Sequence, residues 1–163
     1  MGQISRFKDS LFVSQSISGD YGGGAYQSGF PDFDQYWSSG TGSSQADLFW
    51  EDIGVTLATA TTRNLDLRAL TSGPGGSTVD MREIRYFAMR CRDFALLIAK
   101  GAANGFTGFG SAFSLVIPAG MWFRLVDPTD GKVPTGAADK VLDITNSSGS
   151  TATYDLLIVG TSV

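Results

Sequence analysis

The sequence predicts an all-β protein, namely an antiparallel β-sandwich or jelly roll with an extended, irregular N-terminal arm. Short apolar stretches recur from residue 47 onward, and turn residues separate them about every 8 to 12 positions, which is typical of a sandwich. The 163 residues include 21 glycines and favour Ser, Thr, Val and aromatic residues, which suit strands and turns. Charged residues make up 17% of the chain, below the average of roughly a quarter. Because the chain prefers residues of strands and turns to the Ala, Leu, Glu and Lys of helices, a helical bundle is disfavoured.

Residues 1–46 are predicted to form the arm, and residues 47–163 the β-sandwich domain. The arm combines Gly/Ser-rich stretches with aromatic residues, whereas fully disordered tails lack aromatic side chains because these supply buried area. Such a segment is expected either to order on the surface of another protein or to pack against its own domain. The candidate partner-binding residues of the arm are Phe30, Phe33, Tyr36 and Trp37.

The first half of the domain contains four candidate strands and one helical turn. Residues 48–60 are rich in Val, Ile and Thr, and residues 65–70 and 85–91 alternate between two faces, as half-buried strands do. Residues 94–99 are continuously apolar, which predicts a strand buried on both faces. One turn of helix is expected at residues 80–83.

The second half contains four further candidate strands. Residues 113–117 and 121–126 are separated by Pro118-Ala119-Gly120, which predicts a hairpin or a tight corner. Residues 140–145 and 154–159 provide the last two strands.

Several of these strands are apolar on both faces, although one face of each sandwich sheet normally meets water. Such strands either lie centrally under loops or meet a neighbouring subunit, and we expect the chain to self-associate. The candidate residues for the core or for self-association are Met121, Trp122 and Phe123.

Composition excludes several kinds of chemistry. The chain has no histidine, which excludes a Ser-His-Asp or Cys-His nucleophile and His-ligated zinc. Its single cysteine, Cys91, cannot form an intrachain disulfide and is expected to be a small core residue. Carboxylate pairs lie next to turn signals, which favours local hydrogen bonding; Asp127 and Asp130 are the weak candidates for a calcium site. We therefore expect a protein that is not an enzyme, with no cofactor, no catalytic residues and no metal site.

Charge and hydropathy bear on the partners. The net charge of −4 provides no positive field that would attract nucleic acid. Four arginines do cluster in sequence, but Glu83 and Asp93 interrupt the cluster, so pairing with acidic groups is favoured over nucleic-acid binding; they are Arg82, Arg85, Arg90 and Arg92. No apolar run approaches about 18 residues, and the first residues lack the apolar run of a signal peptide. We expect a soluble protein made in a cytoplasm, with no membrane partner.

An ordered series of segments covers residues 64–162. A strand at 64–70 precedes a Gly-rich turn, and residues 79–90 follow. Then come Asn104-Gly105-Phe106-Thr107, the run Val116-Ile117-Pro118-Ala119-Gly120 and the closing strand 152–161. In this order and spacing the chain resembles small virion proteins of tailed bacteriophages.

The resemblance implies a β-sandwich or jelly-roll component of the particle with a binding role. The expected function is that of a capsid decoration (cement) protein, a homotrimer on the outer capsid surface that binds the major capsid protein and stabilises its lattice. A tail, baseplate or fibre module of the virion is the first alternative. A carbohydrate-binding β-sandwich, or a glycosidase using Asp pairs, is the second.

Overall fold

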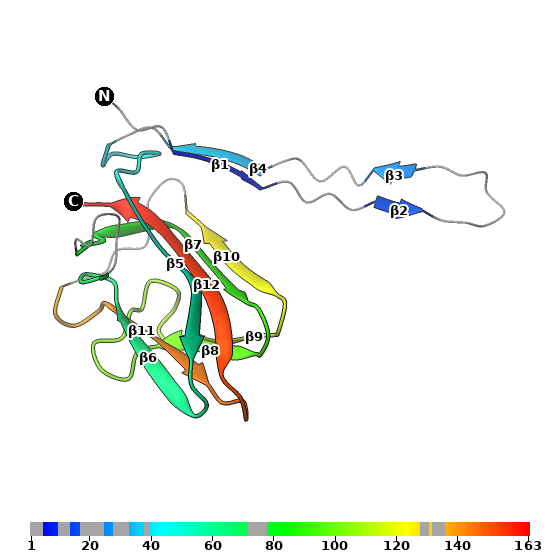
Figure 1. Cartoon of the computed structure of the whole chain (residues 1–163). Helices are drawn as coiled ribbons and strands as arrows, with labels where there is room; N and C mark the ends of the chain where they lie inside the picture. The colour runs from blue at the N-terminus through cyan, green and yellow to red at the C-terminus, as the bar shows by residue number, and fades with distance from the viewer. Residues whose placement is uncertain are drawn as a thin grey trace.

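A computed structural model describes residues 40–71, 78–127, 131 and 136–163 of the chain (Figure 1). Before residue 40 it gives the backbone pairing of four short strands, antiparallel in both pairs: β1 (Ser5–Asp9) with β4 (Phe33–Trp37), and β2 (Ser14–Ser16) with β3 (Ala25–Gln27). The side chains of Phe33, Tyr36 and Trp37, and all of Phe30, lie outside the described residues. The partner-binding role of the arm therefore stays a prediction.

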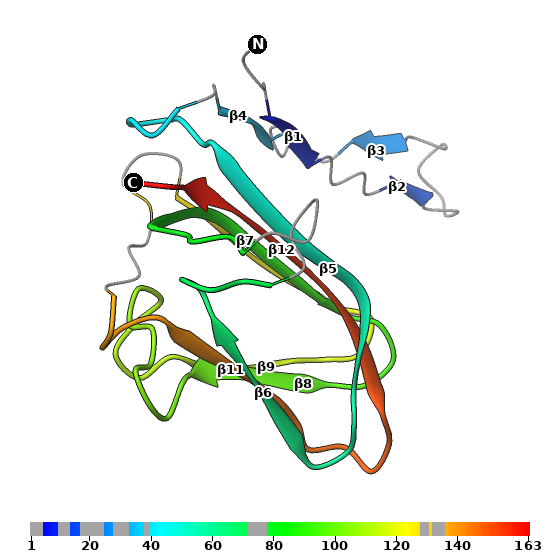
Figure 2. The ribbon, with the colours of Figure 1, turned by 60° about the vertical axis from the view of Figure 1, so that its left-hand side comes forward.

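Two antiparallel sheets of four strands each form the body of the structure. The first sheet has the order β10-β7-β12-β5, with β5 (Leu48–Leu57), β7 (Glu83–Cys91), β10 (Trp122–Val126) and β12 (Ala152–Thr161). The second sheet has the order β6-β11-β8-β9, with β6 (Thr61–Asp66), β8 (Leu96–Lys100), β9 (Ser114–Ile117) and β11 (Val141–Asn146). Figure 2 shows the two sheets as separate layers, and the predicted all-β sandwich is confirmed.

The connections give this sandwich a jelly-roll topology. From β5 to β12 the chain passes to the other sheet at every connection except the one between β8 and β9. As a result β12, the last strand, lies between β5 and β7, and β11 lies between β6 and β8. This is the strand order of an eight-stranded jelly roll, in which two Greek keys enclose one core.

The inward-facing side chains of both sheets form one hydrophobic core. Trp50 of β5, Phe87 of β7 and Tyr154 of β12 are fully buried in the same cluster as Ile98 and Ile144 of the second sheet. Burying a large apolar side chain contributes about 1.5–3 kcal/mol, so this core holds the two layers together.

The loop between β8 and β9 closes one part of the core with aromatic rings. Phe109 makes edge-to-face contacts with Phe87, Phe106 and Phe113 at centroid distances of 5.2, 5.1 and 5.2 Å. Phe106 is completely buried, and a Cβ on Gly108 would lie 2.2 Å from its ring. The Gly/Phe-rich composition of this loop therefore reflects tight packing of rings against the backbone.

Two local predictions are wrong. The strand expected at residues 65–70 ends with β6 at Asp66, because a turn follows in which the N–H of Ala69 donates to the carbonyl of Asp66 (3.0 Å). Residues 80–83 form no helical turn, since the N–H of Met81 donates to Leu67 (3.0 Å) and that of Arg82 to Thr161 (2.8 Å). Among the described residues no helix is long and apolar enough to cross a membrane.

A further element differs in detail from its prediction, and for another the structure decides between two predicted alternatives. In β8 the side chains of Leu97 and Ala99 are partly exposed, so this strand is fully buried on one face rather than on two. Residues 118–120 form a corner between the sheets and not a hairpin, because β9 pairs with β8 and β10 pairs with β7. The corner is held by the N–H of Gly120, which donates to the carbonyl of Cys91 (2.7 Å).

Candidate interaction surface

Alternate residues of the first sheet point away from the core and form its outer face. The strand register places them in rows that run across β5, β12, β7 and β10. One row is entirely apolar or aromatic, and the next has apolar residues at its centre and a charge at each end. The rows are Phe49–Val159–Tyr86–Val126 and Glu51–Leu157–Ala88–Arg124.

A third row completes the outer face. Asp155 lies opposite Arg90, which lies opposite Trp122. On the other side of Asp155, β5 departs from regular pairing, and the N–H of Gly54 donates to the carboxylate of Asp155 (2.8 Å). Ile53 is the outward residue of β5 at this level.

Large apolar side chains of this face are exposed on both edge strands. Ile53 and Phe49 of β5 are 61% and 37% exposed, and Trp122 and Val126 of β10 are 47% and 41% exposed. The inner strands carry buried residues, with Tyr86, Ala88 and Val159 in a cluster that also contains Ala46. The exposed apolar groups of this face therefore lie on its two edges, on either side of a buried centre. Apolar groups exposed together on one face usually mark an interaction site.

A hollow of about 140 Å³ lies between the two edges, with Ala88 and Leu157 among its lining residues. Ile53 and Glu51 line it from β5, and Trp122 and Arg124 line it from β10. The hollow exists because Ala88 is the smallest side chain of its row. Its volume suits a single large apolar side chain.

Trp122 is packed against two guanidinium groups. The Cζ atom of Arg124 lies 4.8 Å from the centroid of the Trp122 ring, and that of Arg90 lies 5.6 Å from it. Such cation–π contacts contribute about 0.5–1 kcal/mol at exposed sites and hold the indole in place. Positive charge therefore collects at the β10 edge of the outer face.

Asp155 is nearly buried on this face and carries its own partners. Burial alone would raise the pKa of Asp155, but the hydrogen bonds from Arg92 and from the N–H of Gly54 outweigh it and lower the pKa. Arg92 Nε lies 2.9 Å from both carboxylate oxygens. The aspartate is therefore charged and occupied within the chain, and it stabilises the irregular pairing of β5 with β12.

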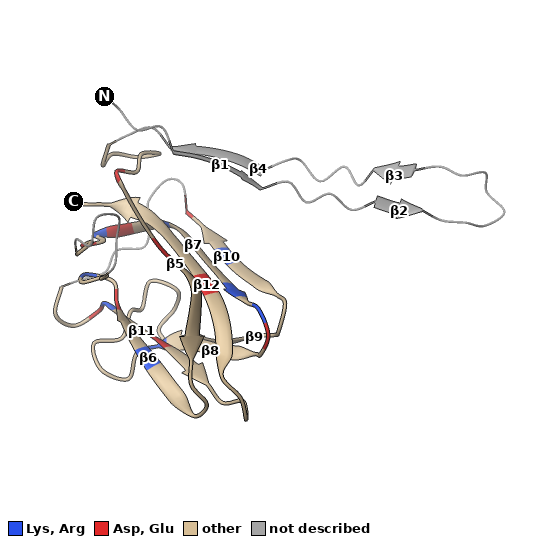
Figure 3. Cartoon of the chain, in the orientation of Figure 1, with Lys and Arg blue, Asp and Glu red and all other residues tan. Residues whose placement is uncertain are grey.

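The outer face of the second sheet is polar across β6 and β11, whereas Leu97, Ala99 and Val116 make it more apolar across β8 and β9. Thr62 and Thr145 share a hydrogen bond between their hydroxyl groups (2.9 Å), and the amide of Asn64 donates to the carboxylate of Asp143 (2.6 Å). Val116, 59% exposed, lies on the edge strand β9 of this sheet. Figure 3 shows where the charged residues of both sheets lie.

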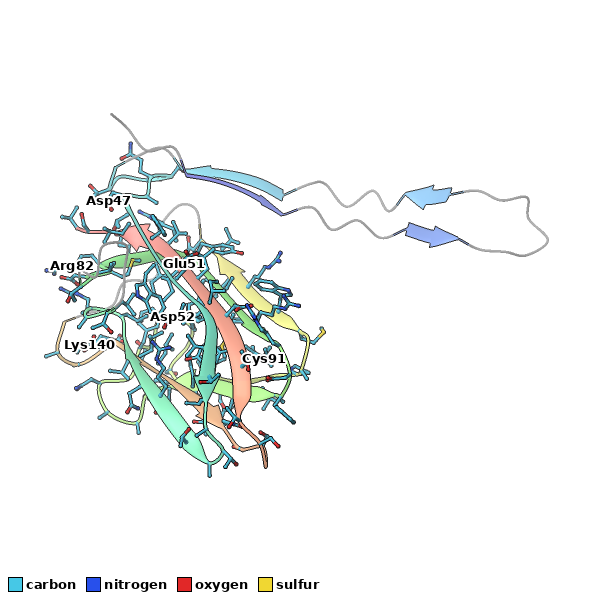
Figure 4. All side chains as sticks on the ribbon, in the orientation of Figure 1. Asp47, Glu51, Asp52, Arg82, Cys91 and Lys140 are labelled. Carbon is cyan, nitrogen blue, oxygen red and sulfur yellow. The ribbon has the colours of Figure 1, made fainter. Side chains whose placement is uncertain are left out.

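Two neighbouring acidic residues of β5, Glu51 and Asp52, lie on opposite sides of the first sheet (Figure 4). Asp52 points into the sandwich, where Arg63 of the second sheet donates to it (2.6 Å) and to the hydroxyl of Tyr154 (2.7 Å). Glu51, the preceding residue, is exposed and lines the hollow on the outer face. Strand alternation thus separates a carboxylate that joins the two sheets from one that is available to a partner.

The predicted pairing of the basic cluster with acidic groups is confirmed for three of its arginines. Arg82 lies 3.3 Å from Asp80, Arg92 lies 2.6 Å from Asp155, and the buried Arg85 pairs with Glu83. Arg90 lies over Trp122 instead.

The three residues predicted for the core or for self-association differ in their burial. Met121 and Trp122 are exposed, whereas Phe123 packs against the core beside Phe87 and Phe109. Phe49, Ile53 and Val126 were missed, although their alternation with inward residues is visible in the sequence. Single exposed apolar residues are common on protein surfaces, so only the register, which brings them together, identifies them as a patch.

The predicted absence of a metal site concerns the acidic and cysteine side chains within residues 40–71, 78–127, 131 and 136–163. Their Cys, Asp and Glu side chains form no group of three or more that could hold a metal ion. Asp130 of the weak calcium candidate lies outside these residues. Cys91 is fully buried, as expected of a core residue, and burial raises the pKa of its thiol.

Comparisons of this chain with family models, with curated proteins and with solved structures gave no match. The resemblance to phage virion proteins therefore remains a prediction from the sequence.

Proposed function

We propose that this chain is a non-enzymatic structural protein of a tailed-phage particle, a capsid decoration protein that binds the coat lattice and stabilises it. The observation that carries the proposal is the apolar outer face of the first sheet, with Ile53 and Trp122 exposed on its two edges. A patch of this kind supports a role in assembly. Jelly rolls occur in viral capsid proteins and in lectins alike, so the surface rather than the fold carries the argument.

The N-terminal segment supports the same role through multivalency. Phe30, Phe33, Tyr36 and Trp37 supply aromatic groups, which dominate the energetics of protein interfaces. When several copies of a weak contact are joined in one assembly, later contacts become intramolecular, and avidity rises by a factor of about 10² to 10⁴. An arm bound across neighbouring coat subunits would stabilise the seams between them.

A carbohydrate-binding role is less well supported. Trp122 is the exposed aromatic residue beside the hollow, and a sugar ring would have to stack on it. Two guanidinium groups already contact that indole, at 4.8 and 5.6 Å from its centroid. Protein contact fits this surface better than stacking of a sugar.

The test is the copy number of the chain relative to the major coat protein in purified particles, measured by quantitative mass spectrometry. A decoration protein is expected in amounts close to those of the coat protein. A few copies per particle would place the chain in the tail, the baseplate or a fibre. Absence from the particle would contradict a virion role.

A further inference from the structure

We propose that two copies of this chain pack together through the outer faces of their first sheets, related by a two-fold axis that runs parallel to the strands. The inference goes beyond the decoration function and does not depend on it: the apolar face that supports a role in assembly meets a second copy of the chain, and contact with the coat is left to the predicted N-terminal arm. The occupant of the apolar face is thus a second copy of the same chain.

The two edges of the face carry matching apolar groups. Ile53 is the most exposed large apolar residue of β5, and Trp122 has a similar place on β10, so that both line the hollow from opposite sides. A two-fold interface uses the same patch on both copies, and each group must therefore find a suitable partner elsewhere in its own patch. Ile53 of one copy and Trp122 of the other are such partners, because both are apolar and exposed.

The charges of the central row select the direction of the axis. Glu51 lies at the β5 end of this row and Arg124 at the β10 end, with Leu157 and Ala88 between them. Rotation by 180° about an axis parallel to the strands places β5 of each copy over β10 of the other. Glu51 then faces Arg124 of the second copy, Ile53 faces Trp122, and the two hollows lie opposite each other.

The other two-fold arrangement with the faces in contact is disfavoured. An axis within the face but perpendicular to the strands would place β5 over β5 and β10 over β10. Glu51 would then face Glu51, and Arg124 would face Arg124, which is repulsive in a surface emptied of water. Face-to-face packing of two sheets with nearly parallel strands is a common geometry, and the axis parallel to the strands is compatible with it.

The proposal differs in a measurable way from the trimer expected from the family resemblance. One chain has a mass of 17.3 kDa, so a two-fold pair has twice that mass and a trimer three times that mass. Sedimentation velocity of the full chain at micromolar concentration distinguishes the two. A two-fold pair is expected, and a monomer or a trimer would overturn the inference while leaving the copy-number test of the decoration function intact.

The matched variants are Ile53→Asp and Val116→Asp. Both residues are β-branched, lie on edge strands and are similarly exposed, at 61% and 59%, but they belong to different sheets. Ile53→Asp is expected to weaken the pair at least about 30-fold, because it places a carboxylate in the apolar contact with Trp122 of the second copy, whereas Val116→Asp leaves the pair intact. The opposite result, or equal effects of the two variants, would contradict the proposed face.

Charge reversal tests the register directly. Glu51→Arg and Arg124→Glu each place like charges opposite one another in the proposed pair, so each variant alone is expected to be monomeric. Mixed in equal amounts they restore both opposite-charge contacts between copies and are expected to form a mixed pair. A contact within one chain would not be restored by mixing, so variants that stay monomeric when mixed would overturn the proposed register.

Discussion

The two sheets of this sandwich share one core but present different outer faces. On the second sheet the cross-strand partners of β6 and β11 are polar, as in the pairs Thr62–Thr145 and Asn64–Asp143, and the apolar pair Leu97–Val116 lies at the other edge. On the first sheet a whole row of four residues, from Phe49 to Val126, is apolar or aromatic. The inner faces of both sheets must be apolar because they form the core, so only the outer faces can differ with their surroundings. We infer that the outer face of the second sheet contacts water and that the outer face of the first sheet contacts protein.

The largest expected effect separates the inner from the outer side of the first sheet, using one tryptophan on each side. Trp50→Ala is expected to lower the free energy of unfolding by about 3–5 kcal/mol, since Trp50 is fully buried and its indole N–H donates to Thr71 (2.9 Å). Trp122→Ala should cost about 1 kcal/mol or less, because its cation–π contacts are exposed. Urea unfolding measures both, and equal losses would show that the outer face belongs to the core.

The next effect concerns the nearly buried charge on the outer face of the first sheet. Asp155→Ala leaves the N–H of Gly54 without its acceptor and is expected to cost about 1–3 kcal/mol. Because the pKa of Asp155 is lowered in the folded state, its contribution is present above the unfolded pKa of about 3.9 and is lost as the pH falls through the folded pKa. Unfolding followed from pH 7 into the acid range should therefore show a shallower acid loss in Asp155→Asn. An unchanged profile would contradict this role.

The smallest effect tests the polar outer face of the second sheet. Thr62→Ala removes the hydroxyl contact with Thr145 and is expected to cost about 0.2–1 kcal/mol, as exposed cross-strand pairs do. Thr145→Ala should cost a similar amount, and the double variant less than the sum of the two. Strict additivity in this cycle would show that the two hydroxyl groups do not interact in solution.

Strand composition and turn spacing were sufficient to predict the sandwich, and the predicted alternation of residues 85–91 between two faces is present in β7. Phe87, Met89 and Cys91 lie in the core, whereas Tyr86 and Ala88 lie on the outer face. The end of β6 could not be predicted, because the apolar alternation continues into a turn in which the N–H of Ala69 donates to the carbonyl of Asp66.

The outer patch itself was beyond sequence reasoning for a related reason. Its rows join residues from β5, β7, β10 and β12, and irregular pairing of β12 with β5 near residue 155 shifts the register between the second and third rows. The hydrophobic pattern within one strand does not show which residues of the other strands pair with it. The sequence did indicate that residues 121–123 matter, but the corner after β9 decides that Trp122 faces outward and Phe123 inward.

The burial of Cys91 has a practical consequence for chemical labelling. The single thiol of the chain is inaccessible, and its raised pKa keeps it protonated, so thiol reagents that require the thiolate would find no competing site in the folded protein. A cysteine introduced at an exposed position would then be the one reactive group. Dyes, spin labels or cross-linkers attached to such an introduced cysteine can therefore report from a chosen face of either sheet without interference from Cys91.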